Sequence, residues 1–270
     1  MNVGFVGHST SSNDQPGEAG VVFATGEAFP SPSSPSGSAS STQHSLSPPL
    51  TPHASPLTES ANLALILATF VVGLQVDQRF GLVGQLAVSV WTWGVFFRLL
   101  HTAPAGGRLP FWVCLAWATA GEIFLSLVWG LYTYRLENIP LFIPPGHVLL
   151  FYFGLILAPR VPQAFVAIVP ALAIAYAAFA WFNGFDTVSV LLTGLFIVCM
   201  LQAEGRRLYA VMFVAALLVE IYGTWIGNWV WHAEVPYFGF ASANPPLAAG
   251  AFYCALDVLV GLTARSIRRR

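Results

Sequence analysis

The sequence predicts an all-α, polytopic membrane protein, and its composition and apolar pattern both indicate this fold class. Hydrophobic residues make up 56% of the 270 residues, while charged residues make up only 9%. Soluble globular domains carry about 25% charged residues, so this composition lies far outside their range. Apolar runs recur from residue 61 to near the carboxyl terminus, and most approach the roughly 20 residues that a membrane-crossing helix needs. We therefore expect a membrane helical bundle.

The first segment, residues 1–60, has a different composition. It is dense in Ser, Pro, Gly and Thr and contains no apolar run long enough to pack, so we expect a disordered tail. No cleavable signal peptide is recognisable, and the first membrane helix is expected to direct insertion. Three histidines of the tail are irregularly spaced, so no metal site is predicted from them: His8, His44 and His53.

The remainder, residues 61–270, is predicted to form about eight spans with both termini in the cytoplasm. Nine of the eleven Arg residues then lie on the cytoplasmic side, and only Arg79 and Arg135 lie outside, as the positive-inside rule requires. One span more or fewer would scatter the Arg residues over both sides. The predicted spans are residues 61–76, 80–98, 110–134, 144–159, 163–182, 187–203, 208–231 and 245–264.

An internal duplication is visible around Glu122 and Glu220. Each glutamate is followed by a hydroxyl residue four positions on, a Gly seven or eight positions on, several aromatic residues, an acid just before a proline, and a Pro-Pro pair. The copies fall on the third and fourth spans and on the seventh and eighth spans. The sequence therefore predicts two parallel four-helix repeats, residues 61–159 and 160–264, related by an axis along the membrane normal.

Three acidic residues are predicted to lie near the middle of the membrane: Glu122, Glu220 and Asp257. A charged side chain at the bilayer centre costs about 2.5–3.5 kcal/mol on insertion scales, and no Arg or Lys inside the membrane is available to pair with these acids. We expect them to share a cavity between the halves, where at least one stays protonated and can donate a proton. The alternative is that protonated carboxyls simply hydrogen-bond helices together.

Polar and aromatic residues near these acids are candidates for substrate binding. Hydroxyls at these positions often back-bond to their own helix, and aromatic residues often anchor a span at the membrane surface, so both alternatives stay open. No motif for a metal, nucleotide or flavin is present, so neither a cofactor nor nucleic acid is predicted as a partner. The candidates are Ser126, Tyr132, Tyr134, His147, Thr224, Trp225, Asn228, Trp229, His232 and Asn244.

The first copy also resembles a known family. Glu122, the run Gly130 to Tyr134 and the proline-bounded run Ile139 to Pro144 are similar to membrane proteins of carotenoid biosynthesis of the hydratase type. The resemblance covers about 40 residues. It implies a lyase that adds water to a terminal double bond of an isoprenoid lipid.

The predicted chemistry fits these residue types. Hydration of an alkene needs a neutral carboxylic acid to protonate carbon, aromatic faces to stabilise the cation, and a second carboxylate to activate water. A proton-initiated cyclase needs the same groups with water excluded. Two other classes stay open: a proton-coupled transporter with carboxylates between two repeats, and a non-catalytic membrane protein.

Overall fold

The computed structural model describes residues 55–270, so most of the predicted tail, with its three histidines, lies outside the described residues. Helix α1 (Pro56–Ala68) begins inside the predicted tail. The side chain of Ser55 accepts a hydrogen bond from the Thr58 N–H, and Pro56 occupies the first turn. Both features are typical of a helix start, so the boundary at residue 60 is wrong by a few residues.

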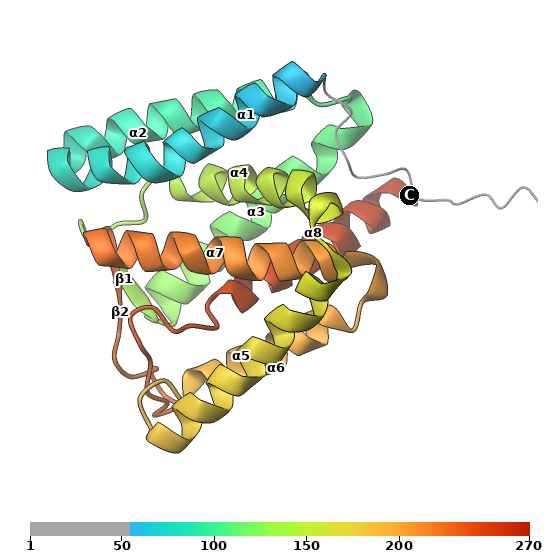
Figure 1. Ribbon diagram of the computed structural model, residues 1–270. Helices are drawn as coiled ribbons and strands as arrows, with labels where there is room; N and C mark the ends of the chain where they lie inside the picture. Colours follow the sequence, from blue (N-terminus) through green and yellow to red (C-terminus); the bar gives the residue numbers. More distant parts are fainter. Residues whose placement is uncertain (1–54) are drawn as a thin grey trace, which may run out of the picture. The chain divides into compact units, whose positions relative to one another are not determined.

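The described residues form helices α1 to α8 and two short strands (Figure 1). Two π-helical segments, η1 (Thr69–Gly73) and η3 (Ile123–Val128), extend α1 and α3. The 3-10 turns η2 (Ala105–Gly107), η4 (Ala158–Arg160) and η5 (Ala203–Gly205) lie between helices. The other elements are α2 (Leu74–Thr102), α3 (Arg108–Glu122), β1 (Tyr132–Tyr134), α4 (Ile143–Leu157), α5 (Gln163–Asn183), α6 (Val188–Met200), α7 (Arg206–Ile226), β2 (Trp229–Trp231) and α8 (Gly250–Arg268).

Within the described residues, five helical stretches are long and apolar enough to cross a membrane. The structure thus agrees with the predicted class in part: it is mostly helical, and these five stretches could span a membrane. Helix α6 is apolar but shorter, at 13 residues. The five stretches are Pro56–Thr102, Arg108–Val128, Gln163–Asn183, Ala203–Ile226 and Gly250–Arg268.

The first of these stretches folds back on itself at Gly81. This residue has φ 58° and ψ −139°, a conformation that favours glycine because it has no Cβ. On either side of the turn, Trp91 Nε1 donates to Thr69 Oγ1 at 2.9 Å, and Arg98 Nε donates to Asn62 Oδ1 at 3.0 Å. These pairs are those of an antiparallel hairpin, visible in Figure 1 as α1 and α2 side by side.

The predicted spans 110–134 and 208–231 were too long, because both end in a strand. Gly130 and Gly227 adopt left-handed conformations, with φ 75° and 85°, that end the helices. The strands then pair antiparallel, with Tyr132 opposite Trp231 and Tyr134 opposite Trp229. The last predicted span, 245–264, also began too early, since α8 starts at Gly250.

The strand pair and most of the arginines lie at opposite ends of the bundle. Helices α3 and α7 both lead into the strand pair, so their carboxyl-terminal ends lie together. At the other end, Arg265 pairs with Glu204 and Arg160 pairs with Glu59. Helices α4 and α7 pack at the centre, with the α1–α2 hairpin on one side and α5–α6 on the other (Figure 1). This arrangement surrounds the ends of α3 and α7 with other helices.

Candidate functional site

Glu122, the last residue of α3, is buried and bound by three side chains. Its Oε2 accepts hydrogen bonds from the hydroxyls of Tyr132, at 2.9 Å, and Tyr134, at 2.7 Å. Its Oε1 lies 2.8 Å from Nε2 of His147, on the first turns of α4. Both tyrosines come from β1 because side chains two apart on a strand point to the same side. The chain that leaves α3 therefore returns to cover its own carboxylate.

Glu220 on α7 has an equivalent set of partners. Its Oε2 accepts hydrogen bonds from the indole N–H groups of Trp229, at 2.8 Å, and Trp231, at 3.1 Å, both on β2. Its Oε1 accepts one from the hydroxyl of Tyr253 on α8, at 3.0 Å. Each glutamate is thus bound by two aromatic donors from the following strand and one ring from the following helix.

The two sets meet at the strand pair. Tyr132 pairs with Trp231, and Tyr134 pairs with Trp229. Two equivalent segments that face each other across a local twofold axis would pair in this way. The rings of His147 and Tyr253 stack with centroids 4.7 Å apart and an interplanar angle of 25°. This local relation agrees with the duplication in the sequence, while the equivalence of the whole halves stays a prediction.

Both glutamates line one cavity of about 40 Å³. A single water needs about 10–15 Å³ of such space, so the cavity has room for a few water-sized groups. Its walls are mostly aromatic and aliphatic, and none of the described residues that line it is Lys or Arg. The lining residues are Thr69, Phe70, Leu74, Glu122, Tyr132, Tyr134, Phe142, Ile143, Gly146, His147, Leu150, Val219, Glu220, Trp229 and Tyr253.

The hydrogen-bond donors in this cavity keep their protons. Burial, followed by the nearby charge of Glu122, raises the pKa of Tyr132 and Tyr134 well above the ordinary value for tyrosine. Their hydroxyls therefore stay protonated and donate to Glu122. Nδ1 of His147 is buried and has no hydrogen-bond partner among the described residues, so one polar atom of this ring is left unsatisfied there.

Ser126, Thr224 and Trp225 lie near the site but do not touch the carboxylates. Ser126 Oγ donates to the carbonyl of Tyr132 at 3.3 Å, and Thr224 Oγ1 back-bonds to the carbonyl of Glu220 at 2.8 Å. Trp225 is 78% exposed and is not among the lining residues. The two hydroxyls therefore stabilise the local backbone, while Trp225 faces the surroundings of the bundle.

Asn244 and His232 instead hold the strands. Asn244 Oδ1 accepts a hydrogen bond from the backbone N–H of Trp231 at 2.9 Å. His232 Nε2 lies 2.8 Å from Thr133 Oγ1, between the two strands. Both side chains therefore position the donors of the glutamates without contacting the cavity.

Asp257 is not among the lining residues, so the cavity contains two of the three predicted acids. It is 4% exposed, and neither carboxyl oxygen has a hydrogen-bond partner among the described residues. Asp257 lies one turn after Tyr253 on α8, about 6 Å along the helix and away from the strands. The expectation that all three acids share one cavity is therefore wrong for Asp257.

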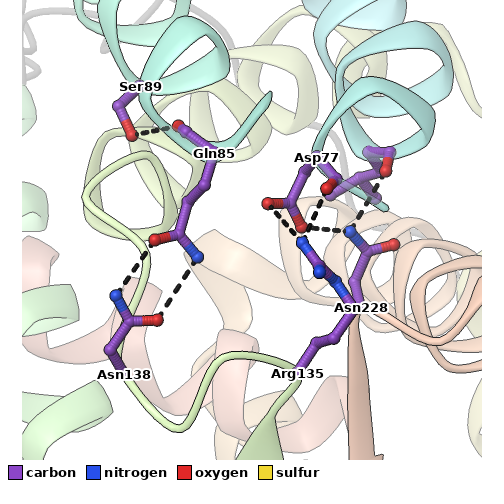
Figure 2. Close-up of polar contacts among 7 residues, drawn as sticks. Asp77, Gln85, Ser89, Arg135, Asn138 and Asn228 are labelled. Carbon is purple, nitrogen blue, oxygen red and sulfur yellow. Dashed lines mark hydrogen bonds and ion pairs between the residues drawn. The ribbon is translucent and has the colours of Figure 1, made fainter. Parts of the chain in front are cut away.

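A second polar cluster fixes the α1–α2 hairpin beside the cavity (Figure 2). Asp77 is 1% exposed, and Arg135 Nη2 donates to its carbonyl at 2.6 Å and lies 3.4 Å from Oδ1. The amide of Asn228 donates to Asp77 Oδ2 and, at 3.1 Å, to the carbonyl of Leu74. Asn228, predicted as a substrate-binding residue, is thus part of this cluster. Sequence reasoning missed Asp77, although an acid in an apolar hairpin is a usable signal.

A further pair in Figure 2 joins the same hairpin to the loop after β1. Gln85 and Asn138 exchange two amide hydrogen bonds, at 3.3 Å and 3.0 Å. Tyr222 on α7 adds a third connection, because its hydroxyl donates to the carbonyl of Val71 at 2.9 Å and accepts from Gln75. The hairpin residues that line the cavity are therefore held from three sides.

The described residues contain no group of three or more His, Cys, Asp or Glu side chains placed to hold a metal ion. The chain matches no protein-family model, no curated protein and no solved structure. Its function is therefore inferred from the geometry of this site.

Proposed function

We propose that this protein is an integral membrane enzyme in which Glu122 and Glu220 transfer protons to and from an alkene in a lipid substrate. One observation carries the proposal: two buried glutamates line one small aromatic cavity, and the described residues provide no Arg or Lys in its lining. A carboxyl donates a proton only in its neutral form, and an aromatic cavity without a cationic side chain is a suitable place for that form.

Glu220 is the proposed acid and Glu122 the proposed base. All three partners of Glu220 are neutral donors, whereas Glu122 lies 2.8 Å from an imidazole that can take up a proton and stabilise the carboxylate. The carboxyl of Glu220 gives its proton to one alkene carbon, the π electrons form the new C–H bond, and the adjacent carbon becomes a cation. The three donors then stabilise the carboxylate that remains.

The cation can follow either of two routes. In hydration, water adds to the cation and releases a proton to Glu122. In cyclisation, a second double bond attacks, and Glu122 removes a proton from carbon. Tyr132, Tyr134 and Trp229 line the cavity, and a cation over the face of any of these rings would be stabilised by about 0.5–2 kcal/mol. A proton returning from Glu122 to Glu220 restores the starting state; His147 contacts Glu122, Tyr253 contacts Glu220, and the rings of these two residues stack.

The resemblance of the first copy to carotenoid hydratases supports an isoprenoid as the substrate class. We also propose eight membrane crossings in two parallel four-helix repeats, with both termini and the arginine-rich end in the cytoplasm. The strand pair then lies toward the outer face. Reporter fusions at Asp186 and Arg207 test this topology, because the two positions should report opposite sides of the membrane. The same side for both would contradict it.

The function is tested by comparing lipids from cells with and without the protein by mass spectrometry. Hydration adds 18 Da to an isoprenoid lipid, and cyclisation changes its chromatographic retention at constant mass. Glu122→Gln and Glu220→Gln should each lose the product. Glu204→Gln is the matched control, because the Glu204 side chain is 85% exposed at the opposite end of the bundle. An unchanged lipid profile, or full product in both cavity variants, would favour a transporter or a non-catalytic protein.

A further inference from the structure

A second cavity, of about 260 Å³, adjoins the glutamate cavity and is almost entirely apolar. Leu192 and Leu195 of α6 form one wall, and the rings of Trp231, Phe240 and Phe252 form much of the rest. It has more than six times the volume of the glutamate cavity. A reacting double bond fits the smaller cavity, but the hydrocarbon chain of a lipid does not.

The two cavities share a wall. Leu131 lines the apolar cavity, and its neighbour Tyr132, the first residue of β1, lines the glutamate cavity. On α8, Phe252 lines the apolar cavity and its neighbour Tyr253 lines the glutamate cavity. The ring of Trp231 lines the apolar cavity while its N–H reaches Glu220. One indole ring therefore separates the apolar cavity from a carboxyl of the proposed acid.

The apolar cavity is held open by polar contacts outside it. Asp186 is fully buried, and its carboxylate accepts the backbone N–H groups of Ala243 and Leu247, both at 3.1 Å, and the hydroxyl of Ser189 at 2.6 Å. These bonds fix the loop between β2 and α8, which carries Phe240, against α6. The shape of the cavity therefore follows from the fold.

Exposed apolar side chains are part of the lining of this cavity. Leu191 and Phe238 both line the cavity, and they are 52% and 63% exposed. Exposed apolar side chains at the rim of an apolar cavity are suited to a ligand that arrives from the membrane interior. A polar metabolite would find only His232 and Ser242 there.

We infer that the apolar cavity binds the hydrocarbon chain of the lipid whose double bond reacts at Glu220. This inference rests on the proposed function. Trp231 is the residue along which the chain passes from one cavity to the other. Its ring lines the apolar cavity and its N–H donates to Glu220 at 3.1 Å, so it contacts both sites.

The test uses the whole protein in dioleoylphosphatidylcholine vesicles with a 16-carbon alkenol that carries a diazirine at the end of its chain. Light should attach the probe to peptides from α6 and from the loop between β2 and α8. Leu192→Trp fills the cavity and should lower this labelling by roughly tenfold, the effect of displacing about two buried methylenes. Val198→Trp is the matched control, because Val198 lies on the same helix and is 60% exposed.

The inference would be overturned if the cavity peptides were labelled to the same extent in Leu192→Trp as in the unmodified protein. Equal labelling by a phosphatidylcholine with a diazirine in its acyl chain would also overturn it, because the cavity would then take bilayer lipid in general. Leu195→Phe is a milder second variant, for use if Leu192→Trp does not fold, and should also reduce labelling.

The inference and the proposed function fail separately. The Glu220→Gln variant should be labelled to the same extent as the unmodified protein, because the substitution leaves the apolar cavity intact. Normal labelling with undiminished product in both glutamate variants would reject the function alone. Loss of product in those variants, without labelling of the cavity peptides, would reject the chain site alone.

Discussion

Replacing Glu220 with Gln or with Ala should separate the chemistry of the site from its stability. In the Gln variant, the amide oxygen can take the position of Oε2 and keep both hydrogen bonds from the indole N–H groups. The amide nitrogen then faces the Tyr253 hydroxyl, which can rotate to accept a hydrogen bond from it. At most one hydrogen bond changes, so the free energy of unfolding should fall by about 0.5–1.5 kcal/mol or less. Activity should fall by at least about 10²-fold, because Gln cannot donate the proton as an acid.

Ala should behave differently, because it removes the acceptor of all three donors. Each buried donor left unpaired costs about 1–3 kcal/mol. Water entering the enlarged cavity satisfies some of these groups, so the expected total is about 3 kcal/mol. Thermal unfolding in detergent measures stability, and product formation in membranes measures activity. Full activity in the Gln variant, or no difference in stability between the Gln and Ala variants, would refute the reasoning.

His147→Gln should keep the fold but reduce product formation by about 10²-fold, measured on extracted lipids, because the proposed base loses its imidazole; undiminished product would remove His147 from the mechanism. Asp77→Leu should destabilise by about 3–5 kcal/mol, because it leaves Arg135 as an unpaired charge of which only 22% is exposed. Combination with Arg135→Met should recover part of this loss, and strict additivity of the two effects would argue against the pair. Gly81→Ala should lower the free energy of unfolding by about 1–3 kcal/mol through backbone strain alone, because a Cβ at this position meets nothing within 4 Å. Gly94 is equally open but has no positive φ, so the control Gly94→Ala should not destabilise the protein.

The sequence predicted the helical segments well because long apolar runs leave few alternatives to a helix in a membrane. It also predicted the partnership of Glu122 and Glu220, through the repeated string that follows each of them. It did not predict the strands. Each strand has three residues and follows a Gly within an aromatic run, so its hydropathy does not differ from that of the preceding helix.

Asp257, Tyr253 and Asp77 were misplaced or missed for one reason, which is an error in where a helix begins or ends. The start of α8 was expected at residue 245 and lies at Gly250, so Asp257 was placed at the depth of the glutamates and Tyr253 was overlooked. Asp77 was assigned to the connection between two spans, although the first helical segment runs on to the turn at Gly81. A shift of four or five residues moves a side chain by about 6–7 Å along the axis, enough to remove it from a cavity.

The two glutamate environments correspond in position, but their donors are not equivalent. An indole N–H can only donate, so Trp229 and Trp231 restrict Oε2 of Glu220 to accepting, and a proton on this residue must lie on Oε1. Tyrosine hydroxyls and imidazole can both donate and accept, so the partners of Glu122 can adjust to either protonation state. The site thus holds one carboxyl whose proton, when present, has a fixed position and one whose surroundings adapt to gaining or losing a proton. The proposed mechanism needs this difference, because its acid must deliver a proton in one direction and its base must accept one from a moving intermediate.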